Sequence, residues 1–315
     1  MPNVLTSTKG MSRNDWLKQR RKGIGGSDAA KVLGISRWGG PLSVYMEKKG
    51  LYTPDEPGEA AYWGTVLEDV VAREFEKQSG LKVRRENKIF FHPNHPWMIA
   101  DIDRRIVGAN AGLECKTTSS FMGEEWKGDE LPDSYYVQIQ HYIAVMGWEI
   151  CYVAVLIGGQ RFLWKPVVRN DSLILTIIEK EREFWEDHFM KDVPPPIGIN
   201  DDPAALWPKQ ADDLIVSASD DVIATARALK EAKARAKDAK RDEEMLAAQL
   251  KVVIGEHEGI EGVCTWKQNK TSLVTDWELV AKELKPDESV IRKYSKEQPG
   301  ARVLKFNKNF DKEAS

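Results

Sequence analysis

The chain has 315 residues, of which 42% are hydrophobic and 30% charged, with a formal net charge of -3. A chain of this size and composition buries one substantial core and a smaller second one. The negative balance excludes a protein that coats nucleic acid through bulk positive charge, so DNA binding would depend on local clusters. No run approaches the ~20 apolar residues of a membrane span, and the start MPNVLTSTKG lacks a signal peptide's apolar stretch. We therefore expect a cytoplasmic protein without membrane contact.

The first forty residues form such a local cluster, with eight basic residues against two acidic ones. Residues 12–50 show helical and loop-like patterns, with Ser12 as one helix cap and Ser27 or Asp28 as the N-cap of a short second helix. Backbone N–H groups at the start of that second helix would suit an anion.

Apolar residues recur at helical spacing over 62–79, and Gly80 supplies the stop. Strands are predicted at 82–91, 97–103 and 111–117, a helix at 133–147, a β-hairpin at 150–157 and 161–168, and a helix at 171–190. These elements predict an α/β domain over residues 1–195, with a mixed central sheet flanked by helices.

Three consecutive prolines at 194–196 end the last helix of that domain. A linker over 196–218 is predicted to follow, and then an appendage over 219–315. The appendage combines a long charged helix, 219–256, with a small α+β module whose strands lie near 262–267 and 301–307.

Chemistry-bearing residues concentrate in the stretch WMIADIDRRIVGANAGLECK, which ends at Lys116. Alternate side chains of a strand share a face, so Glu114 and Lys116 point together while Cys115 points the other way. A short turn can place the preceding strand antiparallel, which lets Asp103 meet Glu114. Such carboxylates bind Mg²⁺, the Cys115 carbonyl offers another oxygen, and the lysine lies near the attacking water in phosphodiester hydrolysis.

An exposed hairpin with a cross-strand ion pair would show the same residues. Two flanking features favour the chemical interpretation. Glu68 lies among small and apolar neighbours on the 62–79 helix, where a carboxylate needs a metal, a lysine or a salt bridge. The 133–147 helix places Gln138, Gln140 and His141 among apolar residues, although such a histidine is more often structural than a ligand.

Four ordered segments resemble the motifs of the YqaJ viral-recombinase and lambda-type exonuclease family. They are RRKGIGGSDAAKVLG (20–34), WGTVLEDVVAREFE (63–76), ADIDRRI with LECKTTS (100–119), and YYVQIQHYIAV (135–145). Together they are specific, although each alone is weak. The resemblance covers about 20–190 and implies a restriction-endonuclease-like core of the PD-(D/E)XK type.

The resemblance also implies roles for individual residues. Asp103, Glu114, Glu68 and the Cys115 carbonyl would hold two Mg²⁺ or Mn²⁺ ions, and Lys116 would position or deprotonate water. Gln140 would support the metal-bound water or the substrate. Arg21, with Ser27 beside it, would grip a terminal 5′-phosphate.

The sequence departs from the family around the catalytic aspartate. Relatives read Pro-Asp-Gly there, whereas this chain reads Ile102-Asp103-Arg104. The turn after the strand can therefore differ, and Asp101 is a possible substitute ligand, although the register favours Asp103.

The function that the resemblance implies is a metal-dependent 5′-to-3′ exonuclease, phage- or prophage-encoded and acting in a bacterial host cell. It would degrade one strand of duplex DNA from its end and leave a 3′ single strand for an annealing protein in recombination. A homotrimeric ring around DNA is implied too, while the appendage would dock the annealing protein or guide DNA. The alternatives are a structure-specific or restriction-like endonuclease and a catalytically silent scaffold that binds DNA ends. An iron–sulfur nuclease is disfavoured because the chain has only three cysteines.

Overall fold

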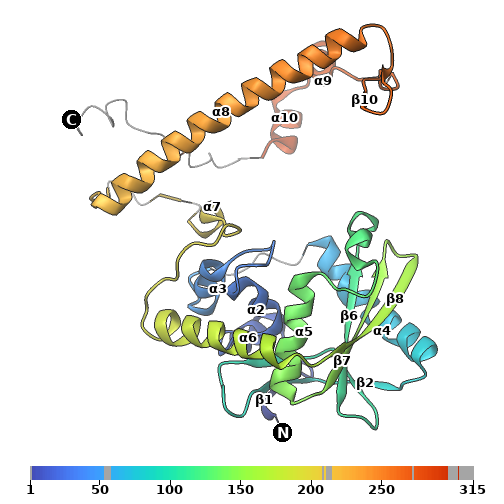
Figure 1. Ribbon diagram of the computed structural model, residues 1–315, viewed down its shortest axis with the longest axis vertical. Helices are drawn as coiled ribbons and strands as arrows, with labels where there is room; N and C mark the ends of the chain where they lie inside the picture. Colours follow the sequence, from blue (N-terminus) through green and yellow to red (C-terminus); the bar gives the residue numbers. More distant parts are fainter. Residues whose placement is uncertain are drawn as a thin grey trace. The chain divides into compact units, whose positions relative to one another are not determined.

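The computed structural model describes residues 2–52, 58–207, 209–210, 215–271, 273–296 and Leu304. It divides the chain into two compact units, residues 1–208 and 209–315. The first unit contains the predicted α/β domain, and its elements follow one another in the order shown by the colours of Figure 1. Among the described residues, no helix has both the length and the apolar character needed to cross a bilayer.

Two sheets form the centre of the first unit. The smaller sheet has the strand order β1-β3-β4 and is antiparallel, and the larger has the order β2-β5-β6-β7-β8. In the larger sheet β6 and β7 are parallel, while the other neighbours are antiparallel. The mixed sheet predicted from the sequence is therefore confirmed. The strands are β1 (Asn3–Ser7), β2 (Val83–Arg85), β3 (Lys88–Phe91), β4 (Ile99–Asp101), β5 (Arg104–Ile106), β6 (Ala111–Thr118), β7 (Ile150–Ile157) and β8 (Arg161–Val168).

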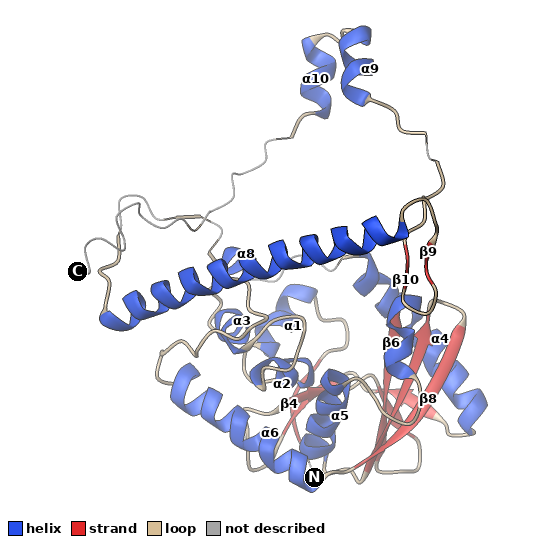
Figure 2. Cartoon of the chain, turned by 45° about the horizontal axis from the view of Figure 1, so that its top comes forward, coloured by secondary structure: helices blue, strands red, loops and turns tan. Residues whose placement is uncertain are grey.

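Helices cover both faces of the larger sheet (Figures 1 and 2). Those of the first unit are α1 (Arg13–Arg20), α2 (Gly26–Val32), α3 (Pro41–Lys48), α4 (Glu59–Ser79), α5 (Asp133–Met146), α6 (Asp171–Glu183) and α7 (Pro203–Leu206), with the 3-10 helix η1 (Ser120–Trp126) and the π-helix η2 (Phe184–Phe189). The predicted helix stop is confirmed, because Gly80 ends α4 in the left-handed conformation at φ 73°. The expected N-cap of α2 is wrong: Gly25 caps it, and Asp28 instead accepts a bond from the Gly25 N–H at 2.9 Å.

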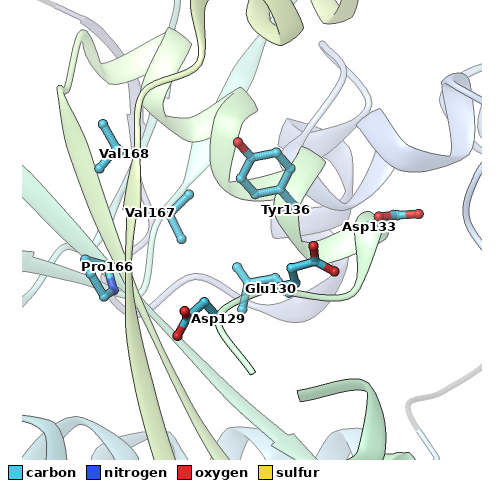
Figure 3. A pocket seen from close by; sticks show the side chains of 8 residues that line it. Asp129, Glu130, Asp133, Tyr136, Pro166, Val167 and Val168 are labelled. Atoms are coloured by element: carbon cyan, nitrogen blue, oxygen red, sulfur yellow. The ribbon is translucent and has the colours of Figure 1, made fainter. Parts of the chain in front are cut away.

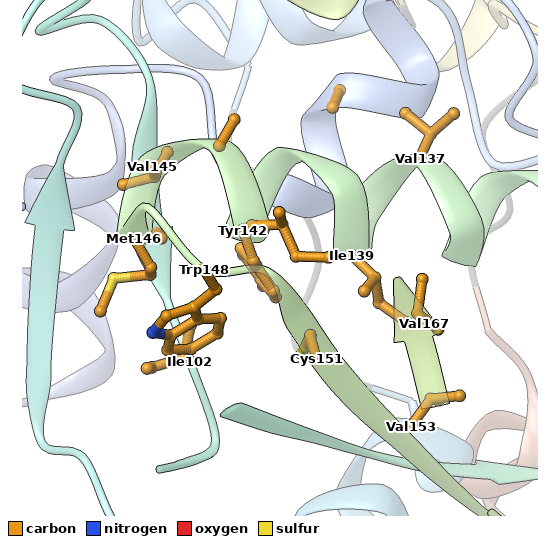
Figure 4. Packing of buried hydrophobic residues seen from close by; sticks show 14 of the residues in the cluster. Ile102, Val137, Ile139, Tyr142, Val145, Met146, Trp148, Cys151, Val153 and Val167 are labelled. Carbon is orange, nitrogen blue, oxygen red and sulfur yellow. The ribbon is translucent and has the colours of Figure 1, made fainter. Parts of the chain in front are cut away.

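The core has one layer on each side of the larger sheet. On one side the buried face of α4 packs against β5, β6 and β7. On the other side α5 packs on β7, and Figure 4 shows Ile139 and Tyr142 pointing toward the strand that carries Cys151 and Val153. A strand buried on both faces can hold charged side chains only where they find partners. This condition applies to β6, whose Glu114 is 4% exposed.

Helix α5 is also fixed by a buried polar contact. The His141 imidazole is fully buried, with Nδ1 2.8 Å from Glu181 Oε1 on α6 and Nε2 2.9 Å from the Ile99 carbonyl oxygen of β4. Glu181 is itself fully buried. His141 therefore ties α5 to α6 and to the smaller sheet, which is a structural role.

The segment after the proline run packs on the first unit. Asp201 is buried and accepts backbone bonds from Gly40 at 2.9 Å and Ser43 at 2.8 Å, which caps the start of α3. Residues 196–207 thus belong to the first unit, which extends beyond the boundary at 195 that the prolines predict.

The second unit begins with one long helix, α8 (Asp220–Ile254), close to the predicted 219–256. The hairpin strands β9 (Gly259–Ile260) and β10 (Cys264–Thr265) follow, and then the helices α9 (Trp277–Leu284) and α10 (Glu288–Tyr294), which the sequence analysis did not anticipate. The strand expected near 301–307 lies outside the described residues, except Leu304.

Replacing Phe75 with alanine tests the packing between α4 and the sheet. The Phe75 ring is fully buried, with centroids 5.5 Å from the rings of Tyr152 and Trp164. We expect Phe75→Ala to lower the free energy of unfolding of the first unit by about 3–5 kcal/mol, measured by urea denaturation. Phe121, at 92% exposed, is the matched control, and its alanine variant should change stability by less than ~0.5 kcal/mol. Equal losses in the two variants would contradict this packing.

Candidate active site

The site forms where β5 and β6 separate. The pair Arg104 and Leu113 is the last in their antiparallel register, and the chain before Arg104 passes into β4 of the smaller sheet. Asp103 lies at this crossover, opposite Glu114. The backbone N–H of Cys115 has no strand partner there and donates instead to Asp103 Oδ2 at 2.8 Å. Asp103 and Glu114 therefore lie opposite each other where the antiparallel pair ends, as the sequence predicted.

Glu114 and Lys116 share the face of β6 that turns toward α5. Lys116 Nζ donates to Glu114 Oε1 at 2.7 Å and to Gln138 Oε1 at 3.2 Å, and it lies 5.1 Å from the centre of the Tyr135 ring. Gln138 Nε2 donates to the same Glu114 Oε1 at 2.8 Å. These contacts fix the lysine beside the carboxylate, as the alternation along the strand predicted.

The carboxylates are electrostatically strained. Burial, then Glu114 and Glu68, raise the pKa of Asp103 well above its ordinary value. Burial also raises the pKa of Glu114, although Lys116 opposes the shift. Burial alone would lower the pKa of Lys116, but Glu114 and Asp103 outweigh it and raise that pKa. The cluster thus holds more negative charge than its single lysine balances.

Two carboxylates of this cluster fit a divalent cation. Glu114 Oε2 is buried without a hydrogen-bond partner, and hard oxygen donors of this kind are the ligands that Mg²⁺ and Mn²⁺ prefer. Among the described residues, no three His, Cys, Asp or Glu side chains already form a metal-binding group. Glu68, the third predicted carboxylate, forms an ion pair with Arg104 and lies 3.4 Å from Arg85 Nη2.

The structure does not place Gln140 at the cluster, so its predicted role is wrong. Gln140 is fully buried, donates to the Val168 carbonyl at 2.8 Å and accepts from the Asn170 N–H at 2.9 Å. Gln138 occupies the expected position instead. The two residues are two positions apart on a helix, and therefore face opposite ways. The i,i+4 relation between Gln138 and Tyr142, whose hydroxyl Gln138 contacts at 3.0 Å, was the signal that could have identified it.

The arginine that reaches Ser27 is Arg20 and not the predicted Arg21. Arg20 Nη2 donates to Ser27 Oγ at 3.0 Å and to Asp28 Oδ2 at 2.8 Å, while Arg21 lies beside Gly50 after α3. The i,i+4 pair of Trp16 and Arg20 on α1 was the available signal, because the guanidinium lies 5.1 Å from the Trp16 ring.

Arg20 and Lys48 share one buried carboxylate, that of Asp28. Lys48 Nζ lies 2.7 Å from Asp28 Oδ2. Burial would raise the pKa of Asp28, but the two cations outweigh it and hold that pKa far below its usual range. This cationic cluster lies near the carboxylates, with Tyr142 between them. The Tyr142 hydroxyl contacts Gln138, which binds Glu114. The Tyr142 ring also packs on α2, where a Cβ on Gly26 would lie only 2.5 Å from it. Only glycine permits so close an approach of α2 to α5.

Asp101 has a hydrogen-bond partner outside the carboxylate cluster, although its charge also contributes to the raised pKa of Glu114. It lies on β4, and its Oδ2 accepts from the Trp16 indole N–H at 2.6 Å. The Trp16 contact gives Asp101 a separate role in fixing α1 on the smaller sheet.

A pocket of about 490 Å³ lies elsewhere, between β8 and the start of α5 (Figure 3). Its walls are Pro166, Val167, Val168, Leu131 and Tyr136, with Asp129, Glu130 and Asp133 around them. None of these residues belongs to the carboxylate and lysine cluster.

Comparison with known proteins shows what the segment that carries this site is similar to. Residues 15–149 match the model of the YqaJ-like viral recombinase domain. The chain is 50% identical over 187 residues to the uncharacterized protein YqaJ of Bacillus subtilis, an alignment that covers 58% of this chain and 59% of that protein. The chain thus spans about three fifths of the length of this curated relative.

One solved structure supports the fold. LHK-Exo in complex with dAMP is 19% identical, covers 57% of this chain and 94% of its own, and has a TM-score of 0.50. The same protein, an alkaline exonuclease from Laribacter hongkongensis, is 17% identical with a TM-score of 0.49 in a second structure, over 57% of this chain and 94% of its own. The predicted restriction-endonuclease-like core is confirmed. The matched segment, residues 15–149, contains Glu68, Asp103, Glu114, Lys116 and Gln138.

Proposed function

We propose that the chain is a metal-dependent exonuclease that degrades one strand of linear duplex DNA from its 5′ end. The observation that carries the proposal is the buried cluster of Asp103, Glu114 and Lys116, in which Glu114 keeps one unpartnered oxygen. The YqaJ-like domain and the fold shared with an alkaline exonuclease support a nuclease. The 5′-to-3′ direction of degradation, the use of a divalent metal and the preference for a 5′-phosphorylated end are parts of this proposal.

Each residue has a distinct task in the proposed reaction. Asp103, Glu114 and the Cys115 carbonyl would hold Mg²⁺ or Mn²⁺, which supplies Lewis acidity toward the phosphate and lowers the pKa of a bound water. Lys116, kept protonated by Glu114, donates a proton or hydrogen bond near the scissile phosphate. Gln138 holds Lys116 and Glu114 in register.

The cationic cluster beside the site supports recognition of a phosphorylated end. Arg20 and the buried Lys48 share the carboxylate of Asp28, so the cluster keeps one positive charge beyond that carboxylate. Arg20, the more exposed of the two cations, also contacts the Ser27 hydroxyl. Arginine binds phosphate oxygens in a planar fork, and a neighbouring hydroxyl adds a donor. We therefore assign the 5′-phosphate contact to Arg20 and Ser27.

Assembly and partner are part of the same proposal. Following the family resemblance, we propose a homotrimer that hands the 3′ single strand to an annealing protein. Light scattering that gave the mass of one 35.7 kDa chain, with full processivity retained, would exclude the trimer.

Nucleotide release from linear duplex DNA tests the main proposal. With Mg²⁺ present, we expect the 5′-phosphorylated strand to be degraded, the 5′-hydroxyl strand to be degraded more slowly, and covalently closed circles to remain intact. Lys116→Ala should lower the rate at least ~100-fold, because it removes charge stabilisation and proton transfer together. Lys127→Ala is the matched control, since Lys127 is largely exposed and pairs with Glu124. Cutting of circles would favour the endonuclease alternative, and a fully active Lys116→Ala would contradict the site.

Two glutamine variants separate catalysis from stability. Gln138→Leu should lower kcat about 10-fold or more with little change in melting temperature, because it releases Lys116 and Glu114. Gln140→Leu should leave kcat of the folded protein near wild type but cost about 1–3 kcal/mol, because backbone groups of Val168 and Asn170 lose their partners. The reverse pattern would restore Gln140 to the site.

The strained carboxylates predict a pH-dependent stability without metal. A carboxyl pKa raised in the folded state means that folding is favoured at low pH, and that this advantage disappears as pH rises through the folded pKa. With chelator at pH 8, Asp103→Asn should therefore raise the melting temperature, by about 2–4 °C if the relief is about 1 kcal/mol, and give no gain near pH 4.

Added Mg²⁺ should raise the melting temperature of the wild type more than that of Asp103→Asn. Asp129→Asn, on an exposed connection, serves as the control and should shift neither value. A wild type insensitive to Mg²⁺ would count against the metal site.

A further inference from the structure

Arg104 is a buried cation within the carboxylate cluster. It follows Asp103 directly, is 3% exposed, and its Nη1 donates to the Asp103 carbonyl at 2.8 Å. The same guanidinium forms ion pairs with Glu68 through Nη1 and with Asp69 through Nη2. One side chain therefore engages two successive carboxylates of α4.

Glu68 pairs with arginines, and its charge also acts on the two carboxylates of the site. Its side chain is only 22% exposed, and Arg104 is its nearer cationic partner, with Arg85 Nη2 at 3.4 Å. Its charge nevertheless acts on the site, because it contributes to the raised pKa values of both Asp103 and Glu114. Arg104 Nη1 contacts both a Glu68 carboxylate oxygen and the Asp103 carbonyl oxygen, so Glu68 lies close to the backbone of Asp103.

Arg104 keeps a second ion-pair partner, Asp69, if the Glu68 side chain moves away. Asp69 binds its other nitrogen, and Asp69, Arg85 and Arg104 line a pocket of about 330 Å³. The guanidinium can therefore keep one ion pair while losing the other. A lysine at this position would hold Glu68 less firmly, because a single ammonium group does not bridge two carboxylates as a planar fork does.

We propose that Arg104 competes with the divalent metal for Glu68. In the metal-free protein Arg104 neutralises Glu68, and metal binding draws Glu68 from Arg104, which stays on Asp69. Arg104 is then a positioning residue that sets the metal concentration at which the site fills. This inference rests on the proposed function, since it assumes that Glu68 is a metal carboxylate.

Binding of Mn²⁺ to the full chain tests this competition directly, through the paramagnetic resonance signal of free Mn²⁺. Arg104→Gln should tighten Mn²⁺ binding about fivefold, because the competitor for Glu68 is gone. Arg104→Lys should also tighten it, although it keeps the positive charge. Arg85→Gln is the matched control: it removes the same charge from a more exposed arginine at longer range, and should change affinity less than about twofold.

The outcomes separate the inference from the proposed function. Tightening in both Arg104 variants, with Arg85→Gln near wild type, supports the competition. Two results would show that Arg104 acts only through its general charge, and would overturn the proposed competition. One is tighter Mn²⁺ binding in Arg104→Gln but not in Arg104→Lys. The other is equal tightening in Arg104→Gln and Arg85→Gln. Weaker or unchanged binding in Arg104→Gln would overturn it too. Should Arg104→Gln fail to fold, the comparison of Arg104→Lys with wild type decides alone.

Glu114→Gln tests the underlying metal site in the same assay. Wild-type protein that binds no more Mn²⁺ than Glu114→Gln would refute the proposed metal site itself, and the competition with it. Loss of Mn²⁺ in Glu114→Gln together with unchanged binding in both Arg104 variants would refute the competition alone.

Discussion

The separation of β5 from β6 beyond Arg104 is the constraint on which the rest of the site depends. An antiparallel pair that continued would bond the Cys115 N–H to the backbone of the neighbouring strand. Because the chain leaves for the smaller sheet, that N–H is free to bind the Asp103 carboxylate. The same departure opens the edge of β6, where Glu68 approaches from α4 on the other face of the sheet. The passage of the chain from one sheet to the other thus brings the Asp103 carboxylate to the edge of β6.

Charge balance links the fold to the proposed chemistry. Three carboxylates gather at this edge, and the protein supplies Lys116 on one side of the sheet and Arg104 on the other. In a medium of low polarity such charges are costly unless they are paired. Burial first, and the neighbouring carboxylates after it, raise the pKa values of Asp103 and Glu114. The third carboxylate, Glu68, pairs with Arg104 and more distantly with Arg85.

Helix α5 serves the core and the site with different faces. Gln138 points to the carboxylates, Gln140 satisfies the end of β8, and His141 reaches α6 and the smaller sheet. All three side chains are buried, which leaves little freedom for the helix to rotate. Any shift of α5 that improved one of these contacts would break another. The position of Lys116, which Gln138 contacts, therefore depends on the polar contacts that α5 makes with β8 and α6.

Local patterns determined much of this protein. The hairpin at 150–157 and 161–168, the helix ending at Gly80, and the shared face of Glu114 and Lys116 follow from alternation, spacing and glycine alone, because each is decided within a few residues. The motif order was also sufficient to indicate the family. Tertiary structure decided what local patterns leave open: which of two adjacent arginines reaches Ser27, and which of two glutamines faces Glu114. It also decided that Arg104 pairs with Glu68 and Asp69. These contacts depend on how each helix is rotated against the sheet, and packing between segments distant in the chain sets that rotation.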